Sequence, residues 1–396
     1  MAVSQALLDA FRAQLETQAG KASSYALAYL AAMRAMFPDV GVAEVRDAAI
    51  EGIRESLSIY GDQAAALAGA LFDQLAAEHG YAAGSTVQSV IDDAEIERKV
   101  RYFAGSLASG KAEEFDRSVS DLTGYYVKRS AFENMVRNCE RNGIRYARVP
   151  SGTETCAFCF MLSSRGFVYR SKVSASKNHR TGDGYHRNCD CIVVPGFGDL
   201  PPDAQVEGYA PSQMYDRWSQ CARTVGVDAE KALGSEELRR AVLQEVRTRD
   251  WRWLYTGKVP EITKDRGAKP LDKEKAVADI LARNGFAVHF LKETNKTGVK
   301  TADALLNGEV WEFKIPEGWS KPDERSLPGE HTVRKQFYKA LGKGTKKILL
   351  SNVENRSSLD DLGAVVAKVL ESRDFDFDEA LVVDSSGGSL IRIKVK

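Results

Sequence analysis

Residues 302–315 read ADALLNGEVWEFKI, and this stretch decides how the C-terminal third of the chain folds. Two alternating runs flank Asn307-Gly308, and an Asn-Gly pair between such runs is the strongest short signal for a β-hairpin. On the second strand Glu312 and Lys314 stand two residues apart, so both side chains leave the sheet on one face. The aromatic residues that alternate with them take the opposite, buried face. The stretch therefore predicts a hairpin that presents an acid and an amine together.

The residue types on this hairpin suit the hydrolysis of phosphodiester bonds. That reaction needs a cation to neutralise developing charge and to make a nucleophile from water, and Mg²⁺ or Mn²⁺ prefers carboxylate oxygen. Asp303, which begins the first strand, and Glu312 are the candidate ligands, with the carbonyl of Phe313 as a further one. Lys314 would orient the attacking water or stabilise the transition state, and Glu274, in the preceding helix, could reach the same ion. The alternative is an exposed face whose charges are merely solvated.

The elements around the hairpin follow the order α-β-β-β-α-β, which is the core of the restriction-endonuclease-like fold. Asp272 can cap the first helix, and Asn284-Gly285 can end it. The polar stretch 264–270 is expected to be a flexible linker at the domain boundary. The expected elements are a helix that follows Asp272 and runs to 283, a strand over 286–291, the hairpin, a helix over 332–341, a strand over 346–351, a helix over 359–372, and final strands over 379–384 and 390–394.

The segment from Glu274 to Lys314 resembles the C-terminal tRNA-nuclease domain of contact-dependent inhibition toxins, within the PD-(D/E)xK superfamily. The resemblance covers about the last 125 residues and departs from the usual pattern at Ala302, where the family has proline. It implies tRNA as the substrate and a cognate immunity protein as a partner. The catalytic residues that it implies are Glu274, Asp303, Glu312 and Lys314.

Candidate substrate-binding residues lie in the helix after the hairpin and just beyond it. Thr332, Gln336 and Lys339 share one helix face at i, i+4 and i+7. Basic residues outnumber acidic ones over 264–347 but not over 348–396, so the basic half surrounds the proposed site, as a phosphate-binding surface would. The candidates there for contacts to backbone phosphate are Lys343, Lys346 and Lys347.

Four of the six cysteines lie in a loop-rich insert, residues 146–205. A C-x2-C pair followed by an H-x2-C-x-C motif is a good spacing for structural Zn²⁺. The expected ligands are Cys156, Cys159, His186 and either Cys189, which is preferred, or Cys191, with His179 as an outside candidate. The alternatives are disulfides or unrelated cysteines, and a catalytic HNH-type use of residues 185–188. Thiolates that close the coordination shell leave no open position and disfavour the catalytic use.

Residues 1–145 are expected to be helical, because helix formers dominate and apolar residues recur at helical spacing. Residues 206–263 are expected to return to helix and to run into the linker. The blocks 148–166 and 185–195 resemble the phage Mu F-like minor head proteins of actinobacterial phages and prophages, which carry C-x2-C, S-R-G and H-x2-C-x-C motifs after a helical region. This resemblance covers roughly residues 1–200. It implies a head protein that contacts portal or capsid proteins, a class in which some members carry C-terminal toxin domains.

The composition narrows the remaining possibilities. The 396 residues suggest two to three domains, and a formal net charge of zero names no partner. No run of about 18 apolar residues is present, and the N-terminus lacks the basic and apolar regions of a Sec signal, so neither a membrane anchor nor Sec export is expected. We expect synthesis in the cytoplasm, followed by incorporation into a virion or delivery to a target cell.

The sequence therefore predicts a multidomain chain with a mostly α N-terminal region, a zinc-knuckle insert and an α/β restriction-endonuclease-like C-terminal domain. The favoured function is that of a phage-encoded or prophage-encoded toxin, in which a head-protein-like carrier precedes a Mg²⁺- or Mn²⁺-dependent nuclease. The alternative is a structural head-morphogenesis protein whose C-terminal domain binds capsid or DNA without cutting it. Nothing in the sequence separates RNA from DNA as the substrate.

Overall fold

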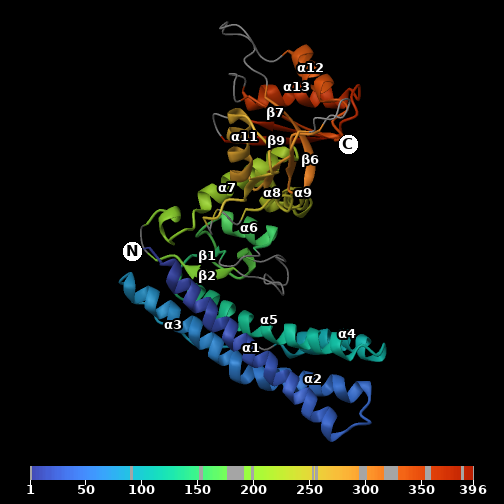
Figure 1. The fold of residues 1–396 in the computed structure, drawn as a ribbon. Coiled ribbons are helices and arrows are strands. Elements are labelled where there is room, and N and C mark those ends of the chain that lie inside the picture. The colour runs from blue at the N-terminus through green and yellow to red at the C-terminus, as the bar shows by residue number, and fades with distance from the viewer. Residues whose placement is uncertain are drawn as a thin grey trace. The chain divides into compact units, whose positions relative to one another are not determined.

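The computed structural model consists of two compact units, Met1–Ser212 and Gln213–Lys396, which are described separately below (Figure 1). The structure describes residues 2–89, 92–150, 155–175, 191–197, 200–251, 254, 257–293, 301–315, 329–352, 358–384 and 388–395. The boundary between the units, at Ser212 and Gln213, falls well before the stretch 264–270 that the sequence suggested as a linker. The helices after Ser212 thus belong to the same unit as the C-terminal sheet.

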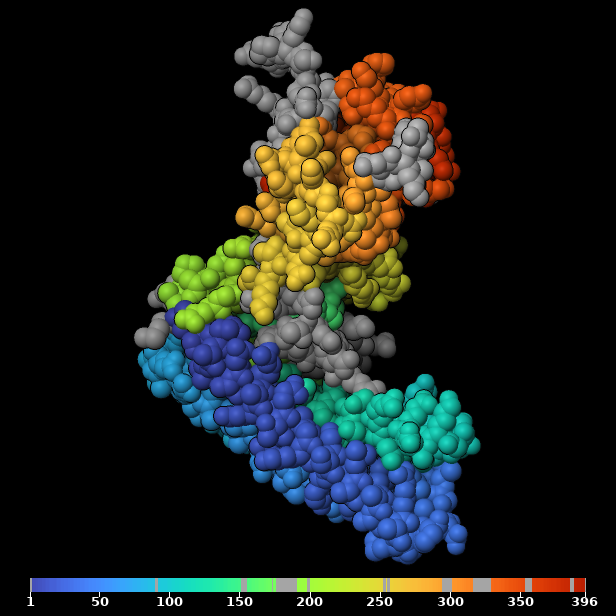
Figure 2. All heavy atoms as spheres, in the orientation of Figure 1, coloured from blue at the N-terminus to red at the C-terminus, as the bar shows by residue number. Residues whose placement is uncertain are grey.

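The N-terminal unit is mostly helical, as expected. Its first helix begins where the Ser4 hydroxyl accepts a hydrogen bond from the Leu7 amide, at 3.2 Å. Figure 2 shows the side chains of α1 and α2 covering one face of this unit. The helices are α1 (Gln5–Met36), α2 (Val42–Ser56), a π-helical turn (Leu57–Gly61), α3 (Asp62–Glu78), α4 (Asp93–Ala108), α5 (Ala112–Arg141) and α6 (Ala157–Ser164). The short antiparallel strands β1 (Tyr146–Val149) and β2 (Ile192–Pro195) were not anticipated.

Helices α1 and α5 pack closely because small residues line their contact. One face of α1 is buried, and the buried side chains in its middle are the small ones of Ala19, Ala22 and Ala26. A Cβ atom at Gly124 of α5 would lie 3.7 Å from the Ala19 side chain, so the two backbones approach closely there. The apolar stripe at helical spacing is what the sequence predicted for this region.

A buried ion cluster joins α4 to α5. Arg129 binds Glu95 at 2.5 Å and Glu133 at 2.6 Å, and Lys172 reaches Glu133 at 2.8 Å. Burial alone would raise the pKa of the Glu133 carboxyl, but the charges of Arg129 and Lys172 outweigh it and hold that pKa below its ordinary value. Removing one member would leave an uncompensated buried charge.

The C-terminal unit is built on a seven-stranded sheet with the order β3-β4-β5-β6-β7-β8-β9. Strands β6, β7 and β8 run parallel to one another, and β3 runs parallel to β4; the remaining pairs are antiparallel. The strands are β3 (Ile262–Lys264), β4 (Val288–Phe290), β5 (Ala304–Leu306), β6 (Glu309–Lys314), β7 (Lys347–Ser351), β8 (Glu379–Val383) and β9 (Leu390–Lys394). The helices are α7 (Pro211–Thr224), α8 (Ala229–Gly234), α9 (Glu236–Val246), α11 (Asp272–Arg283), α12 (Glu330–Ala340) and α13 (Leu359–Glu371).

Apolar side chains cover both faces of this sheet. Helix α11 packs through Val277 and Leu281 on one face, together with Trp311 and Phe313 of β6. Helices α12 and α13 pack on the other face against alternate residues of β7 and β8. Helix α7 also reaches the sheet, where the Gln220 side-chain amide donates to the Leu390 carbonyl at 3.1 Å.

The order of elements from α11 to β9 agrees with the sequence prediction, and so do the end of α11 at Arg283 and both bounds of β9. Two local expectations are wrong. Asp272 does not cap α11: the cap is Leu271, whose amide donates to the Glu274 carboxylate at 2.7 Å. The stretch at 264–270 is not a free linker, because Lys264 belongs to β3 and Asp265 accepts a hydrogen bond from the Lys292 amide.

Candidate active site

The turn of the central hairpin fixes the register of the candidate acidic residues. Asn307 and Gly308 have φ values of 50° and 84°, as a two-residue hairpin turn of type I′ requires. Strands β5 and β6 then pair with Ala304 opposite Trp311. Continuing this register by one residue brings Asp303 opposite Glu312, a position at which side chains on one face lie about 5 Å apart.

Asp303 is also tied directly to the strand that carries Glu312. Its Oδ2 accepts a hydrogen bond from the Phe313 amide at 2.7 Å. The carboxylates of Asp303 and Glu312 are close enough that the charge of Asp303 helps to raise the pKa of Glu312. The two predicted metal ligands are therefore neighbours on the hairpin.

Glu312 is fully buried, which rules out the alternative of a solvated hairpin face. Its Oε1 accepts a short hydrogen bond from the Lys314 ammonium, and Lys343 Nζ lies 3.3 Å from the same atom. Its Oε2 is buried and has no hydrogen-bond partner among the residues that the structure describes. Burial, followed by the charge of Asp303, raises the pKa of Glu312, although Lys314 and Lys343 oppose the rise.

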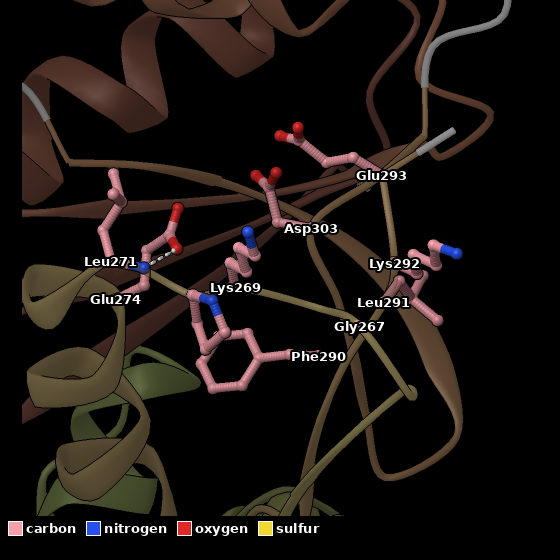
Figure 3. A pocket seen from close by; sticks show the side chains of 10 residues that line it. Gly267, Lys269, Leu271, Glu274, Phe290, Leu291, Lys292, Glu293 and Asp303 are labelled. Carbon is pink, nitrogen blue, oxygen red and sulfur yellow. Dashed lines mark hydrogen bonds between the residues drawn. The ribbon is translucent and has the colours of Figure 1, made fainter. Parts of the chain in front are cut away.

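Glu274 and Asp303 line a cavity of about 430 Å³ in the C-terminal unit (Figure 3). Burial is the main cause that raises the pKa of Glu274, and the charge of Asp303 adds to it. The Glu274 carboxylate, however, is engaged by the Leu271 amide at the start of its own helix. Glu274 therefore lines the same cavity as Asp303, but its carboxylate already accepts the hydrogen bond that caps α11.

The donor set fits a hard divalent cation that keeps much of its water. Mg²⁺ is commonly bound through one or two carboxylates and several waters, and Asp303 with the unpartnered Oε2 of Glu312 offers two carboxylates. A buried oxygen without a partner costs about 1–3 kcal/mol, and a cation at this position would remove that cost. In the part of the chain that the structure describes, no three His, Cys, Asp or Glu side chains converge tightly enough to hold a metal by themselves.

The candidate substrate-binding residues take different places. On α12, Gln336 is buried, Thr332 is half-buried and Lys339 is exposed. Two of the three candidate lysines beyond this helix are bound to carboxylates away from Glu312. Lys346 binds Asp376 at 2.9 Å, and Lys347 binds Glu309 at 2.6 Å and Glu379 at 3.2 Å.

Sequence reasoning missed two lysines that line the cavity, Lys269 and Lys292. In Figure 3 the Lys269 amine points toward Asp303, whereas Lys292 extends away from it. Both were overlooked because the segment before α11 read as a linker. The Asp265–Lys292 hydrogen bond that fixes this segment joins residues 27 apart in the sequence, and no local pattern indicates it.

In the N-terminal unit, the structure places Cys156, Cys159 and Cys191 in one cluster. The Cys156 sulfur accepts a hydrogen bond from the Cys159 amide at 3.3 Å, and the sulfurs of Cys159 and Cys191 are 3.6 Å apart. That separation is far beyond the roughly 2.05 Å of a disulfide. It is close to the edge of about 3.8 Å in a thiolate tetrahedron with Zn–S bonds of about 2.3 Å. The other ligand candidates, His179, His186 and Cys189, lie outside the described residues.

A fully buried arginine faces these thiols. The Arg148 guanidinium lies 2.7 and 3.1 Å from the Cys191 sulfur and 3.9 Å from the Cys159 sulfur. The guanidinium therefore donates to two of the three sulfurs in this cluster. Arg148 also donates to the Ala175 carbonyl at 3.1 Å, so it fixes the neighbouring loop.

Comparisons with known proteins identify the class of the N-terminal unit. The VG15 protein family matches residues 2–221, more than half of the chain. The chain is therefore a phage protein and belongs to the VG15 family. The Gene 15 protein of Mycobacterium phage D29 is 29% identical over 118 residues, a match that spans 24% of this chain and 40% of that protein.

A solved structure is similar to part of the chain. The CdiA-CT/CdiI toxin and immunity complex from Burkholderia pseudomallei matches with 15% identity and a TM-score of 0.26, over 34% of this chain and 100% of that one. Agreement at this level does not define a common fold. None of the helices that the structure describes combines the length and apolar character needed to cross a lipid bilayer.

Proposed function

We propose that the chain is a phage-encoded toxin whose C-terminal unit is a Mg²⁺- or Mn²⁺-dependent nuclease of the PD-(D/E)xK type, with a restriction-endonuclease-like core and tRNA as the favoured substrate. The N-terminal unit would act as a carrier related to minor head proteins, in contact with portal or capsid proteins. A cognate immunity protein would protect the producing cell. The observation that carries the proposal is Glu312, a buried carboxylate opposite Asp303 whose Oε2 has no hydrogen-bond partner in the described part of the chain.

Each residue of the candidate site has a chemical role in this proposal. A bound divalent cation would supply charge neutralisation and a water of lowered pKa. Asp303 and Glu312 would hold the cation, and the hydrogen bond from the Phe313 amide keeps Asp303 against the same strand. Lys314, which is 16% exposed, has its ammonium beside Glu312, where it can orient the attacking water and balance the charge of the transition state. Glu274 would bind a water of the ion's shell after leaving the Leu271 amide.

The N-terminal unit would hold a structural Zn²⁺ ion. Cys156, Cys159 and Cys191, which do not by themselves form a metal site among the described residues, would supply three of the ligands, and the fourth would come from His186 or Cys189. Arg148 would offset the negative charge of the thiolates, because its guanidinium lies against Cys191. This site would stabilise the fold of the unit and take no part in hydrolysis, since thiolates close the coordination shell.

The decisive experiment incubates the purified full-length chain with total tRNA and, separately, with plasmid DNA, in Mg²⁺ or in EDTA. We expect Mg²⁺-dependent cleavage of tRNA, and loss of at least about 100-fold in rate for Glu312→Gln. Glu309→Gln is the matched control: it makes the same chemical change on the same strand, at an exposed residue paired with Lys347.

The outcomes separate the two functions that the sequence left open. If only plasmid DNA is cleaved, the proposed nuclease activity stands and the substrate is DNA instead of tRNA. Binding of nucleic acid or capsid protein without any cleavage, in all metals, supports the structural alternative and refutes the nuclease. Growth arrest on expression of the chain, relieved by Glu312→Gln and not by Glu309→Gln, would extend the result to toxicity.

A further inference from the structure

Lys343 joins the two segments that carry the candidate metal ligands. Its ammonium donates to the Thr301 carbonyl at 3.0 Å, two residues before Asp303. The same ammonium lies 3.3 Å from Oε1 of Glu312. One side chain, which enters from the loop after α12, thus bridges the strand of Glu312 and the backbone that leads into the strand of Asp303.

We propose that Lys343 is a positioning residue of the active site rather than a contact to backbone phosphate. The proposal rests on the proposed nuclease function, because it concerns the same carboxylates. Lys314 and Lys343 together occupy Oε1 of Glu312, so Oε2 is the oxygen that remains for the cation. The hydrogen bond from Lys343 to the Thr301 carbonyl fixes the position of Glu312 relative to Asp303.

The surroundings of Lys343 do not suit a phosphate contact. Its side chain is only 20% exposed, and its ammonium is already shared between a carbonyl and a fully buried carboxylate. Releasing it to bind phosphate would leave the fully buried carboxylate of Glu312 with Lys314 as its one cationic partner among the described residues. An ammonium that orients a ligating carboxylate acts through the metal site, and loss of such a partner typically weakens metal affinity or activity about 10–100-fold.

The test measures metal binding and nucleic-acid binding separately, in the full-length chain. Mn²⁺ is titrated calorimetrically into the wild type, Lys343→Met, Lys343→Arg and Asp303→Asn, the last of which reports binding elsewhere in the chain. Affinity for tRNA is measured in EDTA. The control is Lys368→Met, which removes another ion-paired lysine of the same unit, bound to Glu330 at 2.7 Å.

We expect Lys343→Met to weaken Mn²⁺ binding about 10–100-fold and to leave tRNA affinity in EDTA within about 2-fold of the wild type. Lys343→Arg, which keeps the charge and the donors, should recover part of the loss. In cleavage assays kcat should fall while KM stays nearly constant.

Three results overturn the proposal. Mn²⁺ affinity that is unchanged or higher in Lys343→Met shows that Lys343 does not position the ligands. Loss of tRNA affinity in EDTA with normal Mn²⁺ binding shows a phosphate contact instead. A wild-type chain that binds no Mn²⁺ at the site removes the nuclease proposal and this one together, whereas a chain that binds Mn²⁺ and cleaves nothing removes the nuclease alone.

Discussion

The substitution Asp303→Asn isolates the charge of one candidate ligand from its structural role. Asp303 Oδ2 accepts a hydrogen bond from the Phe313 amide, and the asparagine side-chain carbonyl can accept the same bond. The variant should therefore keep the fold of the hairpin while the site loses one of its two facing carboxylates. Metal-dependent stabilisation is the property that this change should abolish.

The size of the effect follows from linkage between binding and folding. At a Mn²⁺ concentration of about 100 times its dissociation constant, binding stabilises the native state by about 2.7 kcal/mol. For a unit the size of Gln213–Lys396, 1 kcal/mol shifts the melting temperature by about 2–4 °C. The C-terminal transition of the wild type should then rise by roughly 5–10 °C, and that of Asp303→Asn by less than about 1 °C.

Differential scanning calorimetry of the full-length chain, with and without Mn²⁺, measures this difference. Asp272→Asn is the control, because Asp272 is exposed, binds Lys275 at 2.8 Å, and lies at the start of the same α11 helix that carries Glu274. The reasoning is refuted when Asp303→Asn keeps the full rise, or when the wild type shows none. A variant that melts much lower without metal shows that the hydrogen bond to Phe313 was lost as well, and the shift on adding Mn²⁺ still decides.

Three further predictions concern other parts of the molecule. Cys159→Ser should remove about one bound Zn²⁺ per chain in elemental analysis, whereas Cys139→Ser, at a buried cysteine outside the cluster, should not; equal zinc in both variants would exclude the thiol site. Arg129→Met should destabilise the N-terminal unit by about 3–5 kcal/mol in urea unfolding, because it removes the buried cation that Glu95 and Glu133 share. The pKa of Glu133 is held low in the native state, so the stability that it contributes is present above its unfolded value of about 4.5 and is lost as the pH falls through the native value; Arg129→Met should flatten this acid dependence. Lys269→Ala should raise KM for nucleic acid roughly 5-fold, equivalent to about 1 kcal/mol, with kcat nearly constant; a fall in kcat alone would place Lys269 in the chemistry instead.

Most of the C-terminal fold can be predicted from local patterns in the sequence. The Asn-Gly turn set the register of β5 and β6, and this register in turn brought Asp303 opposite Glu312. The alternation around Glu312 separated a core face from a site face, and Trp311 and Phe313 do lie in the core. These features depend on neighbours in the sequence and on a period of two, so a single sequence contains them.

The features that were missed depend on contacts between residues far apart in the sequence. Lys343 reads as one of several lysines in a basic stretch, and only its bonds to Thr301 and Glu312 distinguish it. The segment at 264–270 has the composition of a linker, but pairing of β3 with β4 makes it part of the sheet and of the cavity wall. The composition of a segment indicates its solubility and flexibility. It does not indicate which strand the segment pairs with, because the partner of a parallel strand is far away in the sequence.

The division of the chain bears on how its function can be established. The family match ends at residue 221, close to the end of the N-terminal unit at Ser212. Membership in the VG15 family therefore describes the helical unit and its thiol cluster, and it says little about the sheet that follows. A function for the C-terminal unit has to come from its own residues, and fold alone does not supply it. The proposed nuclease therefore rests on the chemistry of one hairpin. Burying Glu312 with an oxygen that has no hydrogen-bond partner among the described residues costs the protein stability, and a bound divalent cation would remove that cost.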